Sequence, residues 1–302
     1  MLQKPNPANN DILVNIDGRL VHRDEAGVSP FDSSVQNGDA VWEGLRLYDG
    51  RIFRLDDHLR RLRRSAEMLR YQGFPDDALL VRELARTLEA NRMRDGVHVR
   101  LTVSRGLKYT SGLDPRINAS GCSFFILAEH KPPVFDNNHG ISLVVARQRR
   151  PFADVLDQHI HSCNQLTSIL GKLEATAAGA DDAILLDTDD CVAETTSTHF
   201  FLVREGVVLT PTTRACPEGI TRSVVLTICR ELGIGVEETL IHRELLARAD
   251  EAFVTGTMGE ISPVALLDSR PLGSVPGEVT ARIAARFREC TRDPAQGTKI
   301  VR

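Results

Sequence analysis

The stretch "GDAVWEGLRLYDGRIFRLDDHLRRLRRSAEML", residues 38–69, decides the fold of the first part of the chain. Two runs typical of strands meet at Asp49-Gly50, a dipeptide that favours a tight β-turn. Beyond this hairpin, apolar residues recur at the spacing of one helical face: Leu55, Leu59, Leu62, Ala66 and Leu69. Arginines fill the opposite face. The stretch therefore predicts a hairpin followed by a helix, which Asp56 or Asp57 can cap.

The flanking sequence extends this pattern into a helix-backed sheet. Upstream, "DILVNIDGRLVHRD" (11–24) predicts a second hairpin, turning at an Asp-Gly pair. Downstream, residues 76–92 predict a helix, and "VHVRLTVSRG" (97–106) and "CSFFILAEH" (122–130) predict neighbouring strands. The prolines, asparagines and glycine of "KPPVFDNNHG" (131–140) then indicate a linker between domains.

The second half alternates strands and helices irregularly. "ISLVVARQ" (141–148) predicts a strand, "NQLTSILGKLEATAAGA" (164–180) a helix, and "HFFLVREGVVLT" (199–210) a hairpin. We therefore expect an α/β fold in two lobes, a smaller α+β domain over residues 1–133 and a larger α/β domain over 134–302.

Composition narrows the class of protein. The chain has 302 residues, of which 42% are hydrophobic and 26% charged, and a net charge of −4. This profile is typical of a soluble globular protein and gives no basic track for nucleic acid. No apolar run approaches the roughly 20 residues of a membrane helix. The six cysteines are scattered without a CxxC pair, which predicts reduced thiols and a cytoplasmic location.

Three segments could bind an anion. In "EGITRS" (218–223), a glycine precedes Thr221, which we expect at a helix N-cap, where free backbone N–H groups suit a phosphate. Thr257 lies in a Gly/Thr turn after a predicted strand, and Arg61 lies in the arginine-rich helix. Each also has an ordinary interpretation. Thr221 could be a simple helix cap, Thr257 could be part of a strand-ending turn, and Arg61 could belong to a solvated helix face.

Glu194, in "CVAETTSTHF", follows a short apolar run. It could be a loop carboxylate at the surface or a buried one paired with a protonated ring nitrogen. The residues alone favour the surface.

The order and spacing of these segments carry a family resemblance. "GDAVWEGLRLYDG", "IHSCNQL…GKLEA", "VAETTSTHFFLV", "GITR" and "FVTGTMGEISPV" resemble, in register, the motifs of the class IV aminotransferases, the fold-type IV pyridoxal phosphate enzymes. These include branched-chain and D-amino-acid aminotransferases and aminodeoxychorismate lyase. The resemblance runs from about residue 12 to residue 288.

The resemblance implies roles for individual residues. Arg61, in "HLRRL", resembles the arginine that binds the cofactor phosphate, and the backbone of Ile220 and Thr221, with Thr257, resembles the rest of that phosphate site. Glu194 resembles the acid that pairs with the pyridine nitrogen and keeps the ring able to draw electrons. The implied cofactor is pyridoxal 5'-phosphate or pyridoxamine phosphate, held between the lobes of a homodimer that acts on an amino or keto acid.

One position departs from the family. The "IKS-x-N" segment that carries the Schiff-base lysine here reads "IHSCN", with His161 in the place of the lysine. The chain has only five lysines, and of these only Lys108 lies in a loop that family members bring toward the active site. Imidazole forms no stable imine, but its pKa near neutrality suits a general acid or base. Thr195 and His199 also replace a usual glycine and asparagine, so the loop after Glu194 is expected to differ in shape.

Other interpretations of "QHIHSCNQL" (158–166) are weaker. His159 and His161, two residues apart on an extended segment, would point to opposite faces and could not share one metal ion without a turn. Cys163 could be a nucleophile but resembles a small buried thiol. We therefore expect an atypical aminotransferase-like enzyme that binds its cofactor without a covalent link, with His161 as acid or base. The alternatives are a non-catalytic ligand-binding homodimer, or an enzyme that uses His161 and His199 without the cofactor.

Overall fold

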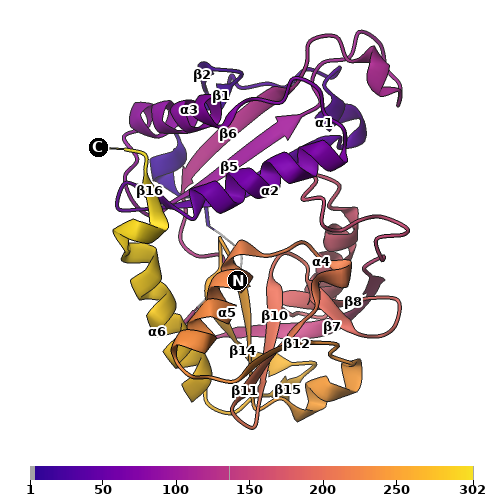
Figure 1. Cartoon of the computed structure of the whole chain (residues 1–302), viewed down its shortest axis with the longest axis vertical. Helices are drawn as coiled ribbons and strands as arrows, with labels where there is room; N and C mark the ends of the chain where they lie inside the picture. Colours follow the sequence, from indigo (N-terminus) through magenta and orange to yellow (C-terminus); the bar gives the residue numbers. More distant parts are fainter. Residues whose placement is uncertain (1–3, 136, 302) are drawn as a thin grey trace. The chain divides into compact units, whose positions relative to one another are not determined.

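The computed structural model of the chain describes residues 4–135 and 137–301 (Figure 1). These residues form two compact units that do not follow the chain in simple order. One unit contains residues 4–132, Ile160–Asn164 and 291–301, and the other contains Pro133–His159 and Gln165–Cys290. The mixed α/β class is confirmed. No helix among the described residues is long and apolar enough to span a membrane.

The unit that holds the N-terminal residues is built on an antiparallel sheet of seven strands in the order β16-β4-β3-β5-β6-β1-β2. Its strands are β1 Leu13–Ile16, β2 Arg19–His22, β3 Ala40–Tyr48, β4 Arg51–Phe53, β5 Val97–Ser104, β6 Ser123–His130 and β16 Gly297–Lys299. Its helices are α1 Ser33–Asn37, α2 Leu55–Met68 and α3 Asp77–Ala90. Both predicted hairpins and both longer helices are thus confirmed.

Helices α2 and α3 cover one face of this sheet (Figure 1). Leu55, Leu59 and Leu62 of α2 pack with Leu80 and Leu84 of α3 in one core with the strands. The predicted cap of α2 was wrong. The N-cap is Arg54, whose φ of 53° lies in the left-handed region, and no side chain caps the helix. Asp57 instead lies in the first turn and pairs with Arg54 and Arg60.

A short stretch from the middle of the chain completes the sheet. Strand β4 pairs with β3 only at Leu47 and Tyr48, which leaves the first half of that edge of β3 open. Residues 160–164 cover it: the N–H of Trp42 donates to the His161 carbonyl at 3.1 Å, and the N–H of Cys163 donates to the Ala40 carbonyl at 2.8 Å. This pairing fixes the "IHSCN" segment, which contains His161, to β3.

The other unit is built on a mixed nine-stranded sheet in the order β12-β11-β10-β13-β14-β7-β8-β9, with β15 paired to β14. Its strands are β7 Ile141–Arg149, β8 Asp182–Leu186, β9 Val192–Thr195, β10 His199–Arg204, β11 Val207–Pro211, β12 Val236–Thr239, β13 Glu251–Gly256, β14 Glu260–Leu267 and β15 Arg270–Pro271. Its helices are α4 Leu166–Ala177, α5 Ile220–Glu231 and α6 Glu278–Arg292, the last ending just past the unit. The predicted hairpin at Glu205-Gly206 is confirmed.

Candidate active site

A buried carboxylate on β3 organises the arginine that the sequence singled out. Glu43 is fully buried and accepts hydrogen bonds from Arg61 Nε at 2.8 Å and Arg61 Nη2 at 2.7 Å. His58 Nδ1 lies 2.6 Å from the same carboxylate. Burial raises the pKa of the Glu43 carboxyl, but Arg61 and His161 outweigh this effect, so the pKa lies well below its usual value. Arg61 is therefore held rigidly, with one edge of its guanidinium against an ionised acid.

Sequence reasoning missed Glu43. The one available signal was a single acid inside the otherwise apolar strand "AVWEGL". An acid in a strand that is buried on both faces needs a charged partner, and Arg61 and His58 lie one helical turn apart on α2.

His161 is held by Trp42 in two ways. The two rings stack with centroids 4.5 Å apart, and His161 Nδ1 lies 2.5 Å from the Trp42 carbonyl oxygen. The backbone N–H of His161 donates to Ser65 Oγ of α2 at 3.0 Å. A carbonyl oxygen only accepts, so Nδ1 carries the ring proton and Nε2 carries the lone pair.

The protonation of His161 follows from its surroundings. Burial lowers the pKa of the ring, Arg61 lowers it further, and Glu43, 3.6 Å from Nδ1, acts in the opposite direction without reversing the shift. The ring is therefore neutral at physiological pH, and Nε2 can accept a proton.

Cys163 and Lys108, the alternatives raised by the sequence, lie in less reactive surroundings. Burial raises the pKa of the Cys163 thiol in spite of Arg100, whose Nη2 lies 3.6 Å from the sulfur, so a thiolate nucleophile is disfavoured. Lys108 is buried, and its amine donates to Asn37 Oδ1 and, at 2.6 Å, to the Gly112 carbonyl. The Lys108 amine is therefore already hydrogen-bonded to two acceptors within the protein.

His159 belongs to the other unit and pairs with Asp157, 2.7 Å from its Nδ1. Within residues 4–135 and 137–301, no group of three or more His, Cys, Asp or Glu side chains is arranged to hold a metal ion.

Glu194 lies on β9 and is buried, so the expectation of a surface position was wrong. Every residue of β9 is buried, and that sheet position could not be read from a short apolar run. The carboxylate pairs with Arg150 at 2.9 Å, and the same guanidinium donates to Ser168 Oγ at 2.8 Å. The acid is therefore fixed in orientation by a buried arginine.

The N-terminus of α5 carries Ile220 and Thr221. The N-cap is Gly219 rather than Thr221, which is the second residue of the helix, and no side chain caps it. The prediction of Thr221 as cap was wrong by two positions because a glycine can occupy the cap without a side-chain oxygen. The first N–H groups of α5 have no acceptor within the helix, so the backbone at Ile220 and Thr221 stays a predicted anion site. Thr257 lies in the turn between β13 and β14.

His199 packs directly on the start of α5. A Cβ added at Gly219 would lie 2.2 Å from His199 Cδ2, so this approach requires glycine. After Glu194, the chain turns through Thr195 and Thr198, whose hydroxyls lie 2.6 Å apart, and no residue from Glu194 to Thr198 has a positive φ. The hydrogen bond between these two hydroxyls closes the turn, and the turn accommodates Thr195 at the position of the usual glycine.

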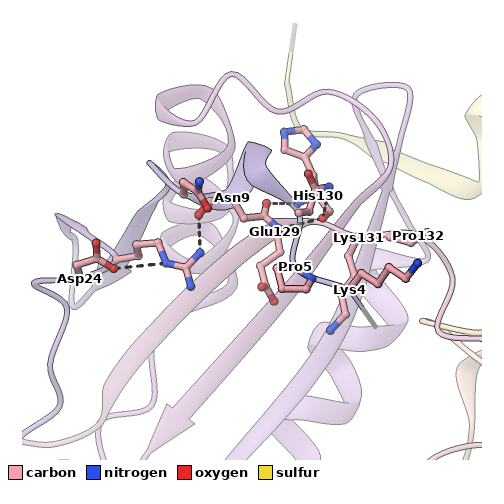
Figure 2. A pocket seen from close by; sticks show the side chains of 11 residues that line it. Lys4, Pro5, Asn9, Asp24, Glu129, His130, Lys131 and Pro132 are labelled. Atoms are coloured by element: carbon pink, nitrogen blue, oxygen red, sulfur yellow. Dashed lines mark hydrogen bonds and ion pairs between the residues drawn. The ribbon is translucent and has the colours of Figure 1, made fainter. Parts of the chain in front are cut away.

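A separate polar cavity of about 540 Å³ lies on the N-terminal unit (Figure 2). It shares no residue with the Glu43 and His161 group. Its lining comprises Lys4, Pro5, Asn6, Asn9, Asn10, Arg23, Asp24, Glu129, His130, Lys131 and Pro132. Arg23 is tied to the Asn9 carbonyl at 2.5 Å, and the Asn6 and Asn9 amides donate to the His130 carbonyl. Its charges are of both signs and indicate no ligand.

Comparisons with known proteins assign the family. The amino-transferase class IV family matches residues 40–267. The chain is 44% identical over 288 residues to branched-chain-amino-acid aminotransferase-like protein 2 of Arabidopsis thaliana, covering 95% of this chain but 52% of that protein. It thus spans about half the length of that relative. It is 37% identical to a putative branched-chain-amino-acid aminotransferase of Methanocaldococcus jannaschii, covering 91% of this chain and 95% of the relative.

Solved structures agree. The branched-chain aminotransferase of Thermoproteus uzoniensis with norvaline superposes with a TM-score of 0.89 at 32% identity, covering 96% of this chain and 99% of that one. The branched-chain amino acid aminotransferase of Thermobaculum terrenum, in its PLP-bound holo-form, gives a TM-score of 0.84 at 28% identity, over 96% and 98% of the two chains. The chain belongs to the class IV aminotransferase family.

Proposed function

We propose that this chain is an atypical class IV aminotransferase that binds pyridoxal or pyridoxamine 5'-phosphate without a covalent link and acts on an amino or keto acid. His161 takes the place of the catalytic lysine. The observation that carries the proposal is the His161 ring itself, stacked on Trp42 and bound through Nδ1 to the Trp42 carbonyl at 2.5 Å. That arrangement directs the basic nitrogen, Nε2, away from the Trp42 carbonyl.

The chemistry of the individual residues supports a phosphorylated pyridine cofactor. Arg61 is oriented by Glu43, the first backbone N–H groups of α5 around Ile220 and Thr221 suit a phosphate, and Thr257 adds a hydroxyl. Glu194, oriented by Arg150, is a fixed acid suited to a protonated ring nitrogen. When bound, the cofactor supplies an electron sink for negative charge on the substrate's α-carbon.

The side chains of this protein then have distinct tasks. His161 Nε2 would carry the proton between the substrate's α-carbon and the C4′ carbon of the cofactor, a role worth about 10²–10⁴-fold in rate. Glu194 holds a proton at the ring nitrogen. Since an imidazole cannot capture the cofactor covalently, cofactor exchange is expected to be faster than in a lysine-containing relative, and amino transfer slower.

A self-associating homodimer and a cytoplasmic location belong to the same proposal. The dimer follows from the family resemblance. The location rests on the six cysteines, none of which forms a disulfide bond.

The single tryptophan of the chain provides the test. Trp42 contacts His161, so its fluorescence reports on a ligand that binds there. We expect saturable quenching by pyridoxal phosphate and pyridoxamine phosphate, and none by inorganic phosphate at the same concentration. Borohydride treatment should leave the mass of the chain unchanged. Absence of quenching would overturn cofactor binding, and cofactor mass attached to Lys108 would overturn the assignment of His161.

Catalysis is tested separately in one turnover. The protein loaded with pyridoxamine phosphate is mixed with a branched-chain keto acid, and the spectral change of the cofactor is followed. His161→Gln should slow this change by about 10²-fold or more while leaving the quenching constant within a few-fold. Equal rates for both proteins would contradict the acid–base role. Quenching without any turnover would instead favour a ligand-binding protein.

A further inference from the structure

The His161 ring is held by one hydrogen bond and one ring contact, and only the two together fix the direction of Nε2. The bond from Nδ1 to the Trp42 carbonyl, at 2.5 Å, fixes one ring atom but allows the imidazole to turn about that point. The contact with the Trp42 indole, at 4.5 Å between centroids and 24° between planes, fixes the plane of the imidazole. The position of the basic nitrogen therefore depends on how firmly the indole is held.

Two further contacts hold the indole of Trp42. Its Nε1–H donates to the Ser162 carbonyl at 3.1 Å, which anchors one edge of the ring. The guanidinium of Arg100 lies over the ring, with Cζ 3.9 Å from the centroid. A cation attracts an aromatic face out to about 6 Å, so the Arg100 contact is a close one. The hydrogen bond restrains the edge of the indole, and Arg100 restrains its face.

The sheet of the N-terminal unit places Arg100 for this contact. Strand β5 pairs with β3 so that Arg100 lies opposite Gly44, two residues along from Trp42. Residues two apart on a strand share a face of the sheet, so Arg100 and Trp42 are diagonal neighbours, within reach of a long side chain. A Cβ added at Gly44 would lie 3.5 Å from Trp42 Cζ3. The glycine thus leaves the space between the two strands to the indole and the guanidinium.

Arg100 also contacts the segment that carries His161. Its Nη2 lies 3.6 Å from Cys163 Sγ, two residues beyond the histidine. The contacts therefore form a closed ring: Arg100 packs on Trp42, Trp42 stacks on His161, and the chain leads from His161 to Cys163 and back to Arg100. Each member of a closed ring of contacts is restrained from two sides, so none of these side chains can shift without disturbing its neighbours.

We propose that Arg100 is a positioning residue: through the Trp42 indole, it holds the His161 ring in the orientation that proton transfer requires. The inference rests on the function proposed above and names a further residue on which that function depends. A displacement of about 1 Å at a reacting group can cost about 100-fold in rate. Without Arg100, the indole is free to shift, the imidazole turns about its remaining hydrogen bond, and Nε2 spends less time in the productive direction.

NMR signals of the His161 ring report on the stack in the protein without added cofactor. The ring current of the stacked indole shifts the imidazole C–H signals upfield, and the signals of this residue are identified by their absence from His161→Gln. We expect Arg100→Met, which places an unbranched apolar side chain at this position, to move them downfield. Arg100→Lys keeps a cation that can lie over the indole, so it should leave them close to their original positions.

A matched control removes a similar contact elsewhere in the same unit. Arg63 Cζ lies 5.1 Å from the Phe74 ring centroid. Arg63→Met therefore loses an arginine packed over an aromatic ring without touching the Trp42 stack, and the His161 signals should not move.

The single-turnover reaction with a branched-chain keto acid separates positioning from direct contact with the substrate. The rate of the spectral change is measured over a range of keto acid concentrations. Arg100→Met should lower the rate at saturation by about tenfold or more, while the half-saturating concentration changes by less than about threefold. Arg100→Lys should recover most of the rate, and Arg63→Met should match the unsubstituted protein.

Several results would overturn the positioning role. One is an unchanged set of His161 signals in Arg100→Met. Another is a higher half-saturating concentration with an unchanged rate at saturation, which would make Arg100 a substrate contact instead. A third is an Arg100→Lys protein no better than Arg100→Met, because the charge over the indole would then not be what holds the ring.

Failure of the proposed function gives a different result. An unsubstituted protein that performs no turnover would overturn that function, whereas the His161 signals would still decide whether Arg100 holds the stack. If Arg100→Met does not fold, as judged by circular dichroism, Arg100→Gln removes the charge with a polar side chain and carries the same expectations.

Discussion

Glu43 and Arg61 form a two-point ion pair inside the N-terminal unit, at 2.8 Å and 2.7 Å, with the carboxylate fully buried and the arginine side chain 11% exposed. The family resemblance assigns this arginine to the cofactor phosphate. The pair fixes the orientation of the arginine: an ionised acid, itself bound by His58, holds one edge of the guanidinium.

Arg61→Ala should therefore destabilise the protein as well as weaken cofactor binding. It leaves the buried Glu43 carboxylate without its strongest partner, and such a loss costs about 3–5 kcal/mol of unfolding free energy. Urea denaturation of Arg61→Ala, Glu43→Gln and the double variant measures the coupling. We expect the double variant to lose less than the two single losses added together; simple additivity would argue against the pair.

Placing a lysine at position 161 tests the proposal that His161 stands where relatives carry the Schiff-base lysine. We expect His161→Lys to gain a covalent, borohydride-reducible link to added pyridoxal phosphate, seen as an added mass on the peptide that contains residue 161. His161→Gln, which also lacks the imidazole, should gain none. If His161→Lys binds cofactor only reversibly, position 161 does not point toward the cofactor aldehyde.

Acid should destabilise the protein through the titration of His98. Burial, together with Lys131, Arg46 and Arg100, lowers the pKa of His98 to about 3. The folded value lies below the unfolded one of 6.5, so the unfolded chain takes up the proton first as pH falls. The stabilising contribution is complete above pH 6.5 and is lost progressively toward pH 3.

His98→Gln removes this titration. Between pH 7 and pH 5, the unfolding free energy of the unsubstituted protein should fall by about 2 kcal/mol more than that of His98→Gln. Urea denaturation at the two pH values measures the difference. Parallel losses in both proteins would mean that His98 is not held neutral.

Gly219 and His199 should be coupled. Gly219→Ala places a methyl group 2.2 Å from His199 Cδ2, which must displace either the ring or the first turn of α5. We expect Gly219→Ala to weaken quenching by pyridoxal phosphate by about tenfold, about 1.4 kcal/mol. His199→Asn, with a smaller side chain, should restore most of the affinity in the double variant. An unchanged Gly219→Ala protein would exclude the α5 N-terminus from the phosphate site.

The sequence predicted helices and strands correctly where the local pattern of residues determines the structure. The hairpin at Asp49-Gly50 and helix α2 follow from turn chemistry and from the spacing of Leu55, Leu59 and Leu62. The helix caps at Arg54 and Gly219 were not predicted, because neither uses a side-chain oxygen.

The site was predictable only in part, because its contacts are distant in sequence. Trp42 meets His161 across 119 positions, and Glu194 is buried because β9 joins a sheet that its own short apolar run does not reveal. Glu43 received no role because its partners lie on the following helix. Family motifs indicated which residues to examine, while the tertiary contacts determined their protonation and orientation.

The pairing of residues 160–164 with β3, and of β16 with β4, has a consequence for how the gene can be divided. A chain truncated after Pro132 would lack both of these partners. The edges of β3 and β4 would then be unpaired, and unpaired strand edges promote aggregation. Recombination between relatives at this point would exchange incomplete lobes. The sheet of the N-terminal unit is therefore complete only when the chain from β1 to β16 is present.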